Sequence, residues 1–428
     1  MKAKTMRILF LTPQLPYPPH KGTTMRNYYL IAHLAARHEI DLLTVVESEH
    51  ELRRSTPLTT LCRRIEGVAM PKRSLSRRAA DTLLSPWPDM GLRLWSPEFA
   101  ARLDAWLTDG DYDVVQVEGI ELARYALQDA SSERRHAKRA RSEQYVFDDH
   151  NCEYLLQQRT FETDLHTLHP KRWIGAAYSF AQWRKLCTFE ASICRAADHV
   201  LAVSGADAAA LQRLVPGLGV TVVPNGIDVE SYATFIPDPS RIGRLALTGE
   251  GTTSLVFTGT MDFRPNVDAA LWFAQEVLPL IRQEEPGARF VVVGQKPHRR
   301  LDTLRVGGRD DVTLTGAVDD TRPYIAEAIV YVVPLRMGGG TRFKILEAAA
   351  MSKAMVSTSL GCEGFPVKHG QELLIADSPR EFAGAVIALL RGPARRAELG
   401  ANARALANAY DWKNIIPKME EIYVKRKA

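Results

Sequence analysis

Short runs of apolar and β-branched residues recur along the chain, and a stretch with helical periodicity follows each of them. An apolar run without alternation is typical of a strand buried on both faces, and strands separated by helices form parallel sheets. Eleven such runs are too many for one doubly wound sheet of common size, and they divide into two similar series. We therefore expect an α/β protein with two Rossmann-like domains, each a doubly wound parallel sheet, facing across a cleft. The first series is Arg7–Leu11, Ile40–Val45, Val114–Val117, Tyr145–Asp148, His199–Val203 and Val220–Val223; the second is Ser254–Thr258, Arg289–Val293, Val312–Thr315, Ile329–Val333 and Ala354–Ser357.

The two series meet in a stretch rich in Pro, Gly and Ser, roughly Thr234 to Thr253, which we interpret as the hinge. Residues 1–235 are assigned to the first domain and residues 252–408 to the second. A terminal helix within 409–428 is expected to pack back on the first domain, with Pro417 breaking or kinking it. Ligands of such sheets bind at the carboxyl ends of the strands, so the loops after the strands are the places to examine.

The composition is that of a globular protein. The chain has 428 residues, of which 46% are hydrophobic and 25% charged. No run approaches the ~18 to 20 apolar residues that a bilayer-spanning helix needs. The five cysteines are scattered without metal-ligand spacing, which favours a reducing, cytoplasmic setting.

Basic residues are concentrated in two stretches, although the net charge is only +5. Two interpretations of these stretches are open. They form either a solvated surface or a surface that binds an anionic partner, which would be an acidic acceptor or the inner face of the membrane. Nucleic acid is disfavoured because no recognition module accompanies the charge. The first stretch contains Arg53, Arg54, Arg63, Arg64, Lys72, Arg73, Arg77 and Arg78, and the second Arg134, Arg135, Lys138, Arg139 and Arg141.

A glycine-rich turn after the run Ile329–Val333 is the strongest chemical signal in the chain. Gly338, Gly339 and Gly340 let the backbone approach a ligand and point its N–H groups inward. Thr341 is expected to cap the helix that follows. A helix start preceded by bare amides is an anion site.

The residues of that helix strengthen the prediction. Arg342 and Lys344 place positive charge in the first turn, which the helix dipole opposes unless an anion is bound between them. Glu347, further along, could accept hydrogen bonds from a ribose hydroxyl pair. The alternative is an ordinary tight strand–helix turn with a surface glutamate.

At this point the chain resembles the retaining GT-B glycosyltransferases of glycosyltransferase family 4, the group 1 sugar transferases. The glycine turn leading into a helix with Leu-Glu-Ala is similar to their donor-binding signature. Further similar segments, in the same order as in the family, are Val200–Leu211, Val220–Tyr232, Leu255–Phe273 and Val312–Leu335. The resemblance implies a nucleotide diphosphate-sugar donor, with Gly259 in the first donor-domain turn and Gly316 beside the base, although an ordinary turn glycine is an equal alternative for Gly316.

Two departures from the family pattern concern the donor site. Family members commonly carry a glutamate near the transferred sugar at the position held by Gly339. They also often have an Arg and a Lys where this chain has Thr260 and Pro265. Arg264 and Lys344 are the candidates to stabilise the leaving diphosphate instead.

The acceptor side is expected in the first domain. Gly22 and Arg26 follow the Pro-rich loop after the first strand, and the resemblance implies that this loop approaches the donor phosphates or the acceptor. His150, directly after the run Tyr145–Asp148, is placed to enter the cleft near an acceptor, with a turn-capping role as the alternative. Glu118 could bind an acceptor hydroxyl or be an ordinary loop carboxylate.

The resulting hypothesis is a transferase that moves a sugar to a glycan or lipid-linked acceptor. The residues alone do not indicate a metal site, because no pair of convergent carboxylates is evident, and no cofactor is expected. The resemblance implies retention of anomeric configuration. A nucleotide-sugar epimerase of the same fold and a non-catalytic nucleotide-binding protein remain as alternatives.

Overall fold

In a computed structural model, the chain forms two units, each built on one parallel β-sheet. The structure describes residues 5–19, 22–53, 56–131, 143–165, 170–236, 253–304, 311–338 and 342–425. Unit 1 comprises Met1–Pro224 and Ile415–Ala428, and unit 2 comprises Asn225–Asn414. The predicted hinge lies largely outside the described residues, because 237–252 are not among them.

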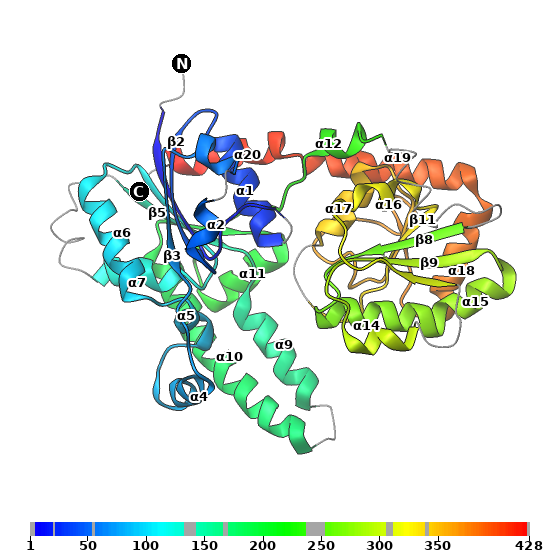
Figure 1. Cartoon of the computed structure of the whole chain (residues 1–428), viewed down its shortest axis with the longest axis horizontal. Coiled ribbons are helices and arrows are strands. Elements are labelled where there is room, and N and C mark those ends of the chain that lie inside the picture. Colours follow the sequence, from blue (N-terminus) through cyan, green and yellow to red (C-terminus); the bar gives the residue numbers. More distant parts are fainter. Residues whose placement is uncertain are drawn as a thin grey trace. The chain divides into compact units, whose positions relative to one another are not determined.

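Unit 1 has a seven-stranded sheet in the order β3-β2-β1-β4-β5-β6-β7, with helices on both of its faces (Figure 1). Its neighbouring strands all pair in parallel. The strands are β1 (Arg7–Thr12), β2 (Glu39–Val46), β3 (Arg64–Ala69), β4 (Val114–Glu118), β5 (Gln144–Asp149), β6 (His199–Ala202) and β7 (Val220–Val222). The helices are α1 (Gly22–Leu34), α2 (Glu49–Arg53), α3 (Leu58–Leu61), α4 (Leu75–Leu84), α5 (Asp89–Arg93), α6 (Pro97–Asp109), α7 (Ala123–Ser131), α9 (Glu153–Leu165), α10 (Pro170–Ala196) and α11 (Gly205–Leu214).

Unit 2 has a six-stranded sheet in the order β10-β9-β8-β11-β12-β13, again with every neighbouring pair parallel. The strands are β8 (Thr253–Thr258), β9 (Ala288–Val293), β10 (Val312–Leu314), β11 (Val330–Val333), β12 (Met355–Ser357) and β13 (Leu374–Ile375). The α-helices are α12 (Val229–Ala233), α14 (Arg264–Trp272), α15 (Leu278–Glu284), α16 (Arg322–Glu327), α17 (Phe343–Ala350), α18 (Pro379–Arg391) and α19 (Pro393–Ala409). A π-helical turn, Phe273–Val277, joins α14 to α15, and a 3₁₀ helix spans Arg299–Leu304.

The last helix, α20 (Trp412–Val424), begins in unit 2 and belongs to unit 1 from Ile415 onward. Its Glu420 accepts a hydrogen bond from His38 Nε2 at 3.1 Å, and its Tyr423 donates from its hydroxyl to Gln116 Oε1 at 3.2 Å. The helix continues through Pro417, so of the predicted break or kink the break is wrong. Unit 2 begins earlier than expected, at Asn225 rather than near 252, since Ile227 pairs with Tyr410 and Asp411 of the same unit.

Each of the eleven predicted runs forms a strand, and the ends differ by at most one residue. The sequence pattern missed β3 and β13, which are both at sheet edges. An edge strand is covered by a neighbour on one side only, and β3 carries Arg64 and Glu66 on a largely half-exposed segment. The apolar-run criterion therefore detects every central strand and the edge strands β7 and β10, and overlooks these two.

Candidate functional site

The strand order of unit 2 places two loops at the point where the sheet changes direction. β8 and β11 are neighbours, although they are distant in sequence, so the loops after them start at the same edge of the sheet. In open parallel sheets this switch point is where ligands bind. The first loop begins at Gly259, and the second runs from Pro334 through Gly338 to the start of α17.

Lys344, in the first turn of α17, is the central side chain of this edge. Its Nζ donates to the Asn266 Oδ1 atom at 3.0 Å and lies 4.1 Å from the centroid of the Phe257 ring. Among the described residues, its hydrogen-bond partner is thus an amide rather than a carboxylate. Burial, with the charge of Arg342, lowers the pKa of Lys344 to about 7. The site holds a cation whose charge the protein does not fully compensate.

Glycines let the surrounding backbone come close to this lysine. A Cβ atom at Gly259 would lie 2.6 Å from Asn266 Nδ2 and 3.1 Å from Lys344 Nζ. Gly338 has a φ of 99°, and a Cβ there would lie 3.4 Å from Arg342 Nη2. These two glycines are therefore required by space and by backbone conformation. Glycine is required at position 294 because of the neighbouring backbone: a Cβ there would lie 1.7 Å from the Gly259 carbonyl oxygen.

Glu347 lies one turn further along α17. Its Oε1 accepts a hydrogen bond from the Tyr232 hydroxyl of α12 at 3.0 Å. Burial raises the pKa of Glu347, while Tyr232 and the charge of Lys344 oppose this shift. The carboxylate is thus held in position by a neighbouring hydroxyl on the same edge as the lysine.

The remaining predicted donor residues do not all lie beside Lys344 in the described structure. Gly339, Gly340 and Thr341 lie outside the described residues. The helix begins later than predicted: its N-cap residue is Arg342, which makes no side-chain capping bond, so the cap is not at the position of Thr341. Arg264 is exposed at the first residue of α14. Gly316 has a φ of 73° after the edge strand β10, and a Cβ there would meet no atom within 4 Å.

In unit 1, two carboxylates occupy the corresponding edge. Glu118 at the end of β4 and Asp148 on β5 are register partners on adjacent strands, and both side chains are fully buried. Arg26 of α1 makes a bidentate contact with Asp148. Its Nε donates to Oδ2 at 2.9 Å, and its Nη2 donates to Oδ2 at 2.8 Å and to Oδ1 at 3.0 Å. The Arg26 Nη1 donates to the Pro224 carbonyl at 3.2 Å.

This geometry corrects the interpretation of Arg26. The resemblance implied a loop approaching substrate, with Arg26 on its helix. The side chain is instead 1% exposed, and its guanidinium is bound to Asp148. The sequence alone does not show whether an arginine on a helix is paired with a carboxylate of the protein or is available to a ligand. Gly22 is the first residue of α1 and is exposed.

His150 lies directly after β5 and faces Glu118. Its Nε2 is 2.6 Å from Glu118 Oε2, and its Nδ1 is 3.7 Å from the position of a Cβ at Gly119. Burial opposes the charged imidazole, but the hydrogen bond and the charge of Glu118, with the charge of Asp148, raise the pKa of His150 above its ordinary value. Burial and the charge of Asp148 also raise the pKa of Glu118. The pair therefore holds a proton more firmly than either group would alone.

Two sets of side chains among the described residues could hold a metal ion. They are Glu118, Asp148 and His150, and Asp149, Cys152 and Glu190. In the first set, Arg26 already neutralises Asp148. In the second set, Glu190 accepts hydrogen bonds from the backbone of Glu153 and Tyr154 at 3.0 and 2.9 Å, and burial raises its pKa to about 7. The sequence pattern does not reveal either set, because Glu118 and Glu190 are remote in sequence from the other members of their sets.

Sequence reasoning also missed Asn266 and Tyr232, which orient Lys344 and Glu347. Asn266 has a signal in the sequence, since a polar residue follows Pro265 at the start of a helix directly after the first strand of the second series. Tyr232 has none, because only the fold brings α12 to α17.

Two family models together match most of the chain. One is described as "Glycosyltransferase Family 4" and matches residues 21–231. The other is described as "Glycosyl transferases group 1" and matches residues 252–392.

Curated relatives share part of their length with this chain. An uncharacterized 44.6 kDa protein in the cps region of Klebsiella pneumoniae is 24% identical over 169 residues, which are 38% of this chain and 44% of that protein. A GDP-mannose-dependent alpha-(1-6)-phosphatidylinositol monomannoside mannosyltransferase of Mycobacterium tuberculosis is 29% identical over 225 residues, 48% of this chain and 56% of that protein. The chain thus spans about half the length of the curated relatives that it matches.

Solved structures match over nearly the whole chain. Sucrose-phosphate synthase from Thermosynechococcus elongatus superposes with a TM-score of 0.69 at 19% identity, covering 98% of both chains. HepE of Anabaena in complex with UDP superposes with a TM-score of 0.65 at 17% identity, covering 97% of this chain and 99% of that one. At these identities the likeness shows the fold, which is the predicted pair of Rossmann-like domains known as GT-B.

Proposed function

The chain belongs to the group 1 glycosyltransferases of family 4, and from this premise we propose that it moves a sugar from a nucleoside diphosphate-sugar to a glycan or lipid-linked acceptor. We further propose that the transfer retains the anomeric configuration, needs no divalent ion, and serves the synthesis of a bacterial surface polysaccharide or exopolysaccharide. Unit 2 is the donor side and unit 1 the acceptor side in this proposal.

The observation that carries the proposal is Lys344 of α17, which is partly buried. Lys344 makes no hydrogen bond to a carboxylate among the described residues. Its burial and the charge of Arg342 outweigh the charge of Glu347, so its pKa is lowered to about 7. A bound diphosphate would supply that charge and restore the ammonium form. Lys344 therefore has the properties of an anion-binding group more than those of a structural one.

Each remaining donor residue has a role in this proposal. Arg264, exposed at the start of α14, supplies a second cation, and the amides near Gly338, Gly339 and Gly340 bind phosphate oxygens. Thr341 belongs to the same turn. Glu347 accepts from the ribose hydroxyls, with Tyr232 holding it, and Gly259 and Gly316 admit the phosphates and the base.

The chemistry follows from a leaving group that remains near the acceptor. The bond between the anomeric carbon and the diphosphate oxygen breaks, and a bond to the acceptor oxygen forms on the same face. The acceptor hydroxyl gives its proton to the departing phosphate oxygen. Cations at the diphosphate stabilise the negative charge that develops. His150, held by Glu118, positions the acceptor in this scheme, and Gly22 lies in the loop that approaches it.

The names of two relatives support the finer parts of the proposal. The Mycobacterium enzyme is named for a phosphatidylinositol mannoside, which is a lipid-linked acceptor, and for GDP-mannose. The Klebsiella protein is named for its place in a cps region. They support a polymer or lipid acceptor, and they leave the base and the sugar of this chain's donor open. Among the described residues, no helix is long and apolar enough to cross a bilayer.

Product analysis with labelled nucleotide sugars tests the function. UDP- and GDP-sugars are incubated with the protein and with membrane extract as the acceptor source, with and without excess chelator. We expect label in a lipid or glycan product, equal yield in chelator, and loss of transfer with retained nucleotide binding in His150→Ala. A new nucleotide sugar would indicate an epimerase, and nucleotide binding without any conversion would indicate a non-catalytic protein. Activity that disappears in chelator would contradict metal independence.

A further inference from the structure

Helix α4 presents its apolar face to solvent. Leu75, Leu83 and Leu84 are 80%, 84% and 84% exposed, and no residue of the helix is buried. Leu75 and Leu83 are eight residues apart and share one stripe with Ala79, which lies between them. Arg78 and Asp81 lie away from this stripe, and Arg77 lies next to Leu84 at the border of the apolar side. A surface helix of a globular protein normally has the reverse orientation.

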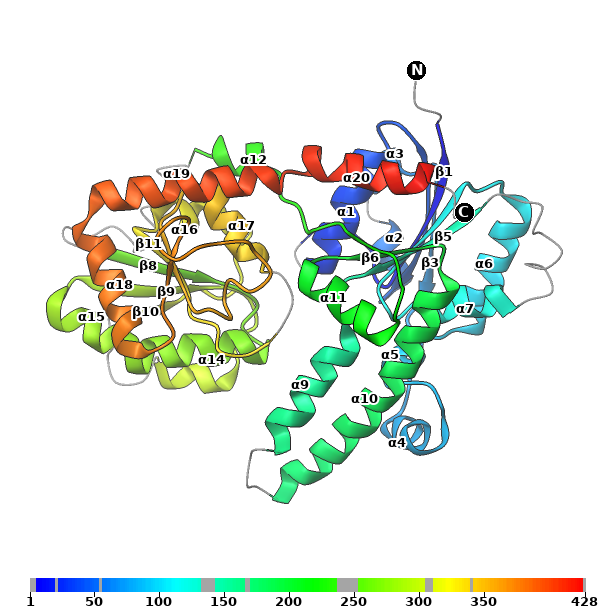
Figure 2. The same cartoon turned by 180° about the vertical axis from the view of Figure 1, so that it is seen from behind.

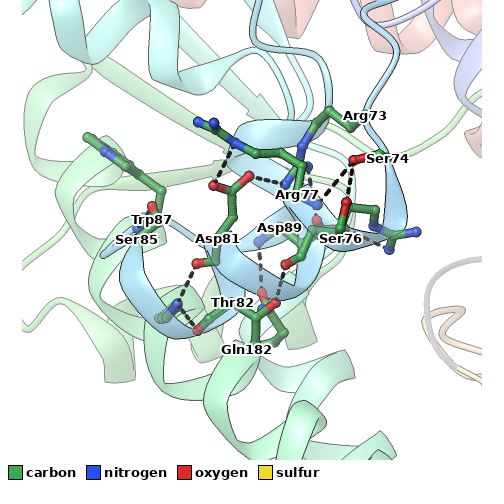
Figure 3. Close-up of polar contacts among 12 residues, drawn as sticks. Arg73, Ser74, Ser76, Arg77, Asp81, Thr82, Ser85, Trp87, Asp89 and Gln182 are labelled. Atoms are coloured by element: carbon green, nitrogen blue, oxygen red, sulfur yellow. Dashed lines mark hydrogen bonds and ion pairs between the residues drawn. The ribbon is translucent and has the colours of Figure 1, made fainter.

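The polar side of α4 is the side that attaches it to the rest of unit 1 (Figure 3). Asp81 binds Arg73 at 2.8 Å, and Arg73 also binds Asp89 at 2.9 Å. Lys185 of α10 donates to the Thr82 and Asp81 carbonyls at 2.6 and 3.3 Å, closing the last turn of the helix. These contacts fix the orientation of α4 and direct its leucines outward.

Positive charge remains on the outer side of this segment. Between Met70 and Asp89 the chain has four basic and two acidic side chains. Both acidic side chains, Asp81 and Asp89, are engaged by arginines, as Figure 3 shows. Lys72 is exposed, and Arg77 is 73% exposed although its Nε lies 3.1 Å from Asp81. The exposed apolar stripe is therefore bordered by cations.

A second group of exposed apolar side chains belongs to the helix that holds α4. On α10, Trp173 is 65%, Phe180 45% and Tyr178 39% exposed. Helix α4 and the α9–α10 hairpin project from the same end of unit 1 in both views (Figures 1 and 2). Aromatic side chains and arginines are typical of surfaces that lie at the boundary between lipid tails and headgroups.

We propose that α4, with Lys72, Arg77 and Trp173, is a docking surface for a bilayer that contains anionic lipids. The leucines enter the headgroup region, and the cations bind the negative headgroups beside them. Charge complementarity favours a bilayer over a protein partner, because the apolar stripe is short and its border is basic. The inference deepens the proposed function by naming the partner that brings a lipid-linked acceptor close, but vesicle binding does not depend on sugar transfer.

Vesicle sedimentation with the full chain tests the proposal. The vesicles are phosphatidylcholine alone or phosphatidylcholine with phosphatidylglycerol. The double variant Leu83→Gln/Leu84→Gln keeps good helix formers and removes the apolar surface. The variant Lys72→Gln/Arg77→Gln removes exposed charge. The control is Ile236→Gln, which changes an aliphatic side chain of unit 2 that is 86% exposed.

We expect the protein and its Ile236→Gln control to bind the anionic vesicles, and less so at high salt. The leucine variant should bind at least about tenfold more weakly. The charge variant should lose about tenfold on anionic vesicles and little on neutral ones. Nucleotide affinity and the midpoint of thermal unfolding should be unchanged in both.

Three results would overturn the proposal. The unaltered protein could fail to bind anionic vesicles, or the leucine variant could bind as well as the unaltered protein. Light scattering could instead reveal a dimer that the leucine variant dissociates, which would make the surface an interface between copies of this chain. Sugar transfer to an acceptor dissolved in detergent, measured separately, shows whether the proposed function holds when the docking proposal fails.

Discussion

The two candidate sites differ in how far their charged side chains are paired with opposite charges. In unit 1, the Nε and Nη2 atoms of Arg26 bind Asp148, and His150 Nε2 lies 2.6 Å from Glu118 Oε2. In unit 2, Lys344 is partly buried beside an amide and an aromatic ring, and its pKa is lowered to about 7. The first site balances its charges within the protein, and the second leaves a positive charge incompletely balanced.

This difference separates groups that build a site from groups that bind a ligand. A paired buried charge is costly to disturb and contributes to the fold. A buried charge that is only partly compensated lowers stability unless a ligand supplies the counter-charge. If Arg26 is structural and Lys344 binds the donor, as we propose, substitutions at the two positions should have different consequences.

The largest effect on stability is expected for Arg26→Met. Removing the guanidinium leaves Asp148 buried without its partner, near Glu118, which should lower the free energy of unfolding by about 3–5 kcal/mol. Urea unfolding measures this loss. Arg37→Met is the matched control, because Arg37 is half exposed in a surface pair with Glu420 and should cost at most about 1 kcal/mol. Equal stability of the two variants would contradict the claim that the Arg26–Asp148 pair stabilises the fold.

Lys344→Met should weaken nucleotide binding without lowering stability, the reverse of Arg26→Met. Loss of a charge-assisted hydrogen bond to phosphate is worth about 1.5–3 kcal/mol, so affinity for a nucleoside diphosphate should fall about 10- to 100-fold while stability stays equal or rises. Calorimetric titration with UDP and GDP measures the affinity. Lys296→Met, at a lysine of the same unit that is 65% exposed, should leave it unchanged. Unchanged nucleotide affinity in Lys344→Met would remove this residue from the donor site.

A smaller and more selective effect is expected for Glu347→Gln. If this carboxylate accepts from the ribose, the variant should bind a nucleoside diphosphate about tenfold more weakly and inorganic pyrophosphate equally well. Competition of the two ligands against a fluorescent nucleotide separates them. An equal loss for both ligands would mean that Glu347 acts on the phosphates through Lys344, and full affinity for both would contradict the ribose assignment.

The sequence predicts eleven of the thirteen strands and their order of appearance, because these depend on local signals, while the donor edge stays a prediction. Apolar runs mark strands buried on both faces, and glycines beside cations mark an anion site. Lys344 and Glu347 were identified in this way, and the structure places both at one edge of the unit 2 sheet.

Pairings between distant segments account for what the sequence could not predict. Arg26 is 122 residues from Asp148, and nothing in either segment indicates their contact. The basic stretch around Arg73 has the same difficulty, since Arg63 and Arg73 are engaged by Asp41, Asp81 and Asp89 while Lys72 and Arg77 stay exposed. The second basic stretch, around Arg134, lies outside the described residues. Charge density along the chain therefore does not separate internal ion pairs from a basic surface.

Proton uptake on nucleotide binding tests the central claim most directly. In the free protein Lys344 has a pKa of about 7, so at about pH 8 it is mostly neutral, and a bound diphosphate should raise this pKa and charge the group. Calorimetry of UDP or GDP binding in two buffers of different ionisation enthalpy counts the protons. We predict that, per nucleotide bound, the unaltered protein takes up close to one proton more than Lys344→Met at about pH 8, and little more at about pH 6, where Lys344 is already charged. Nucleotide binding with the same proton count in the unaltered protein and in Lys344→Met would contradict the claim that this lysine receives the diphosphate.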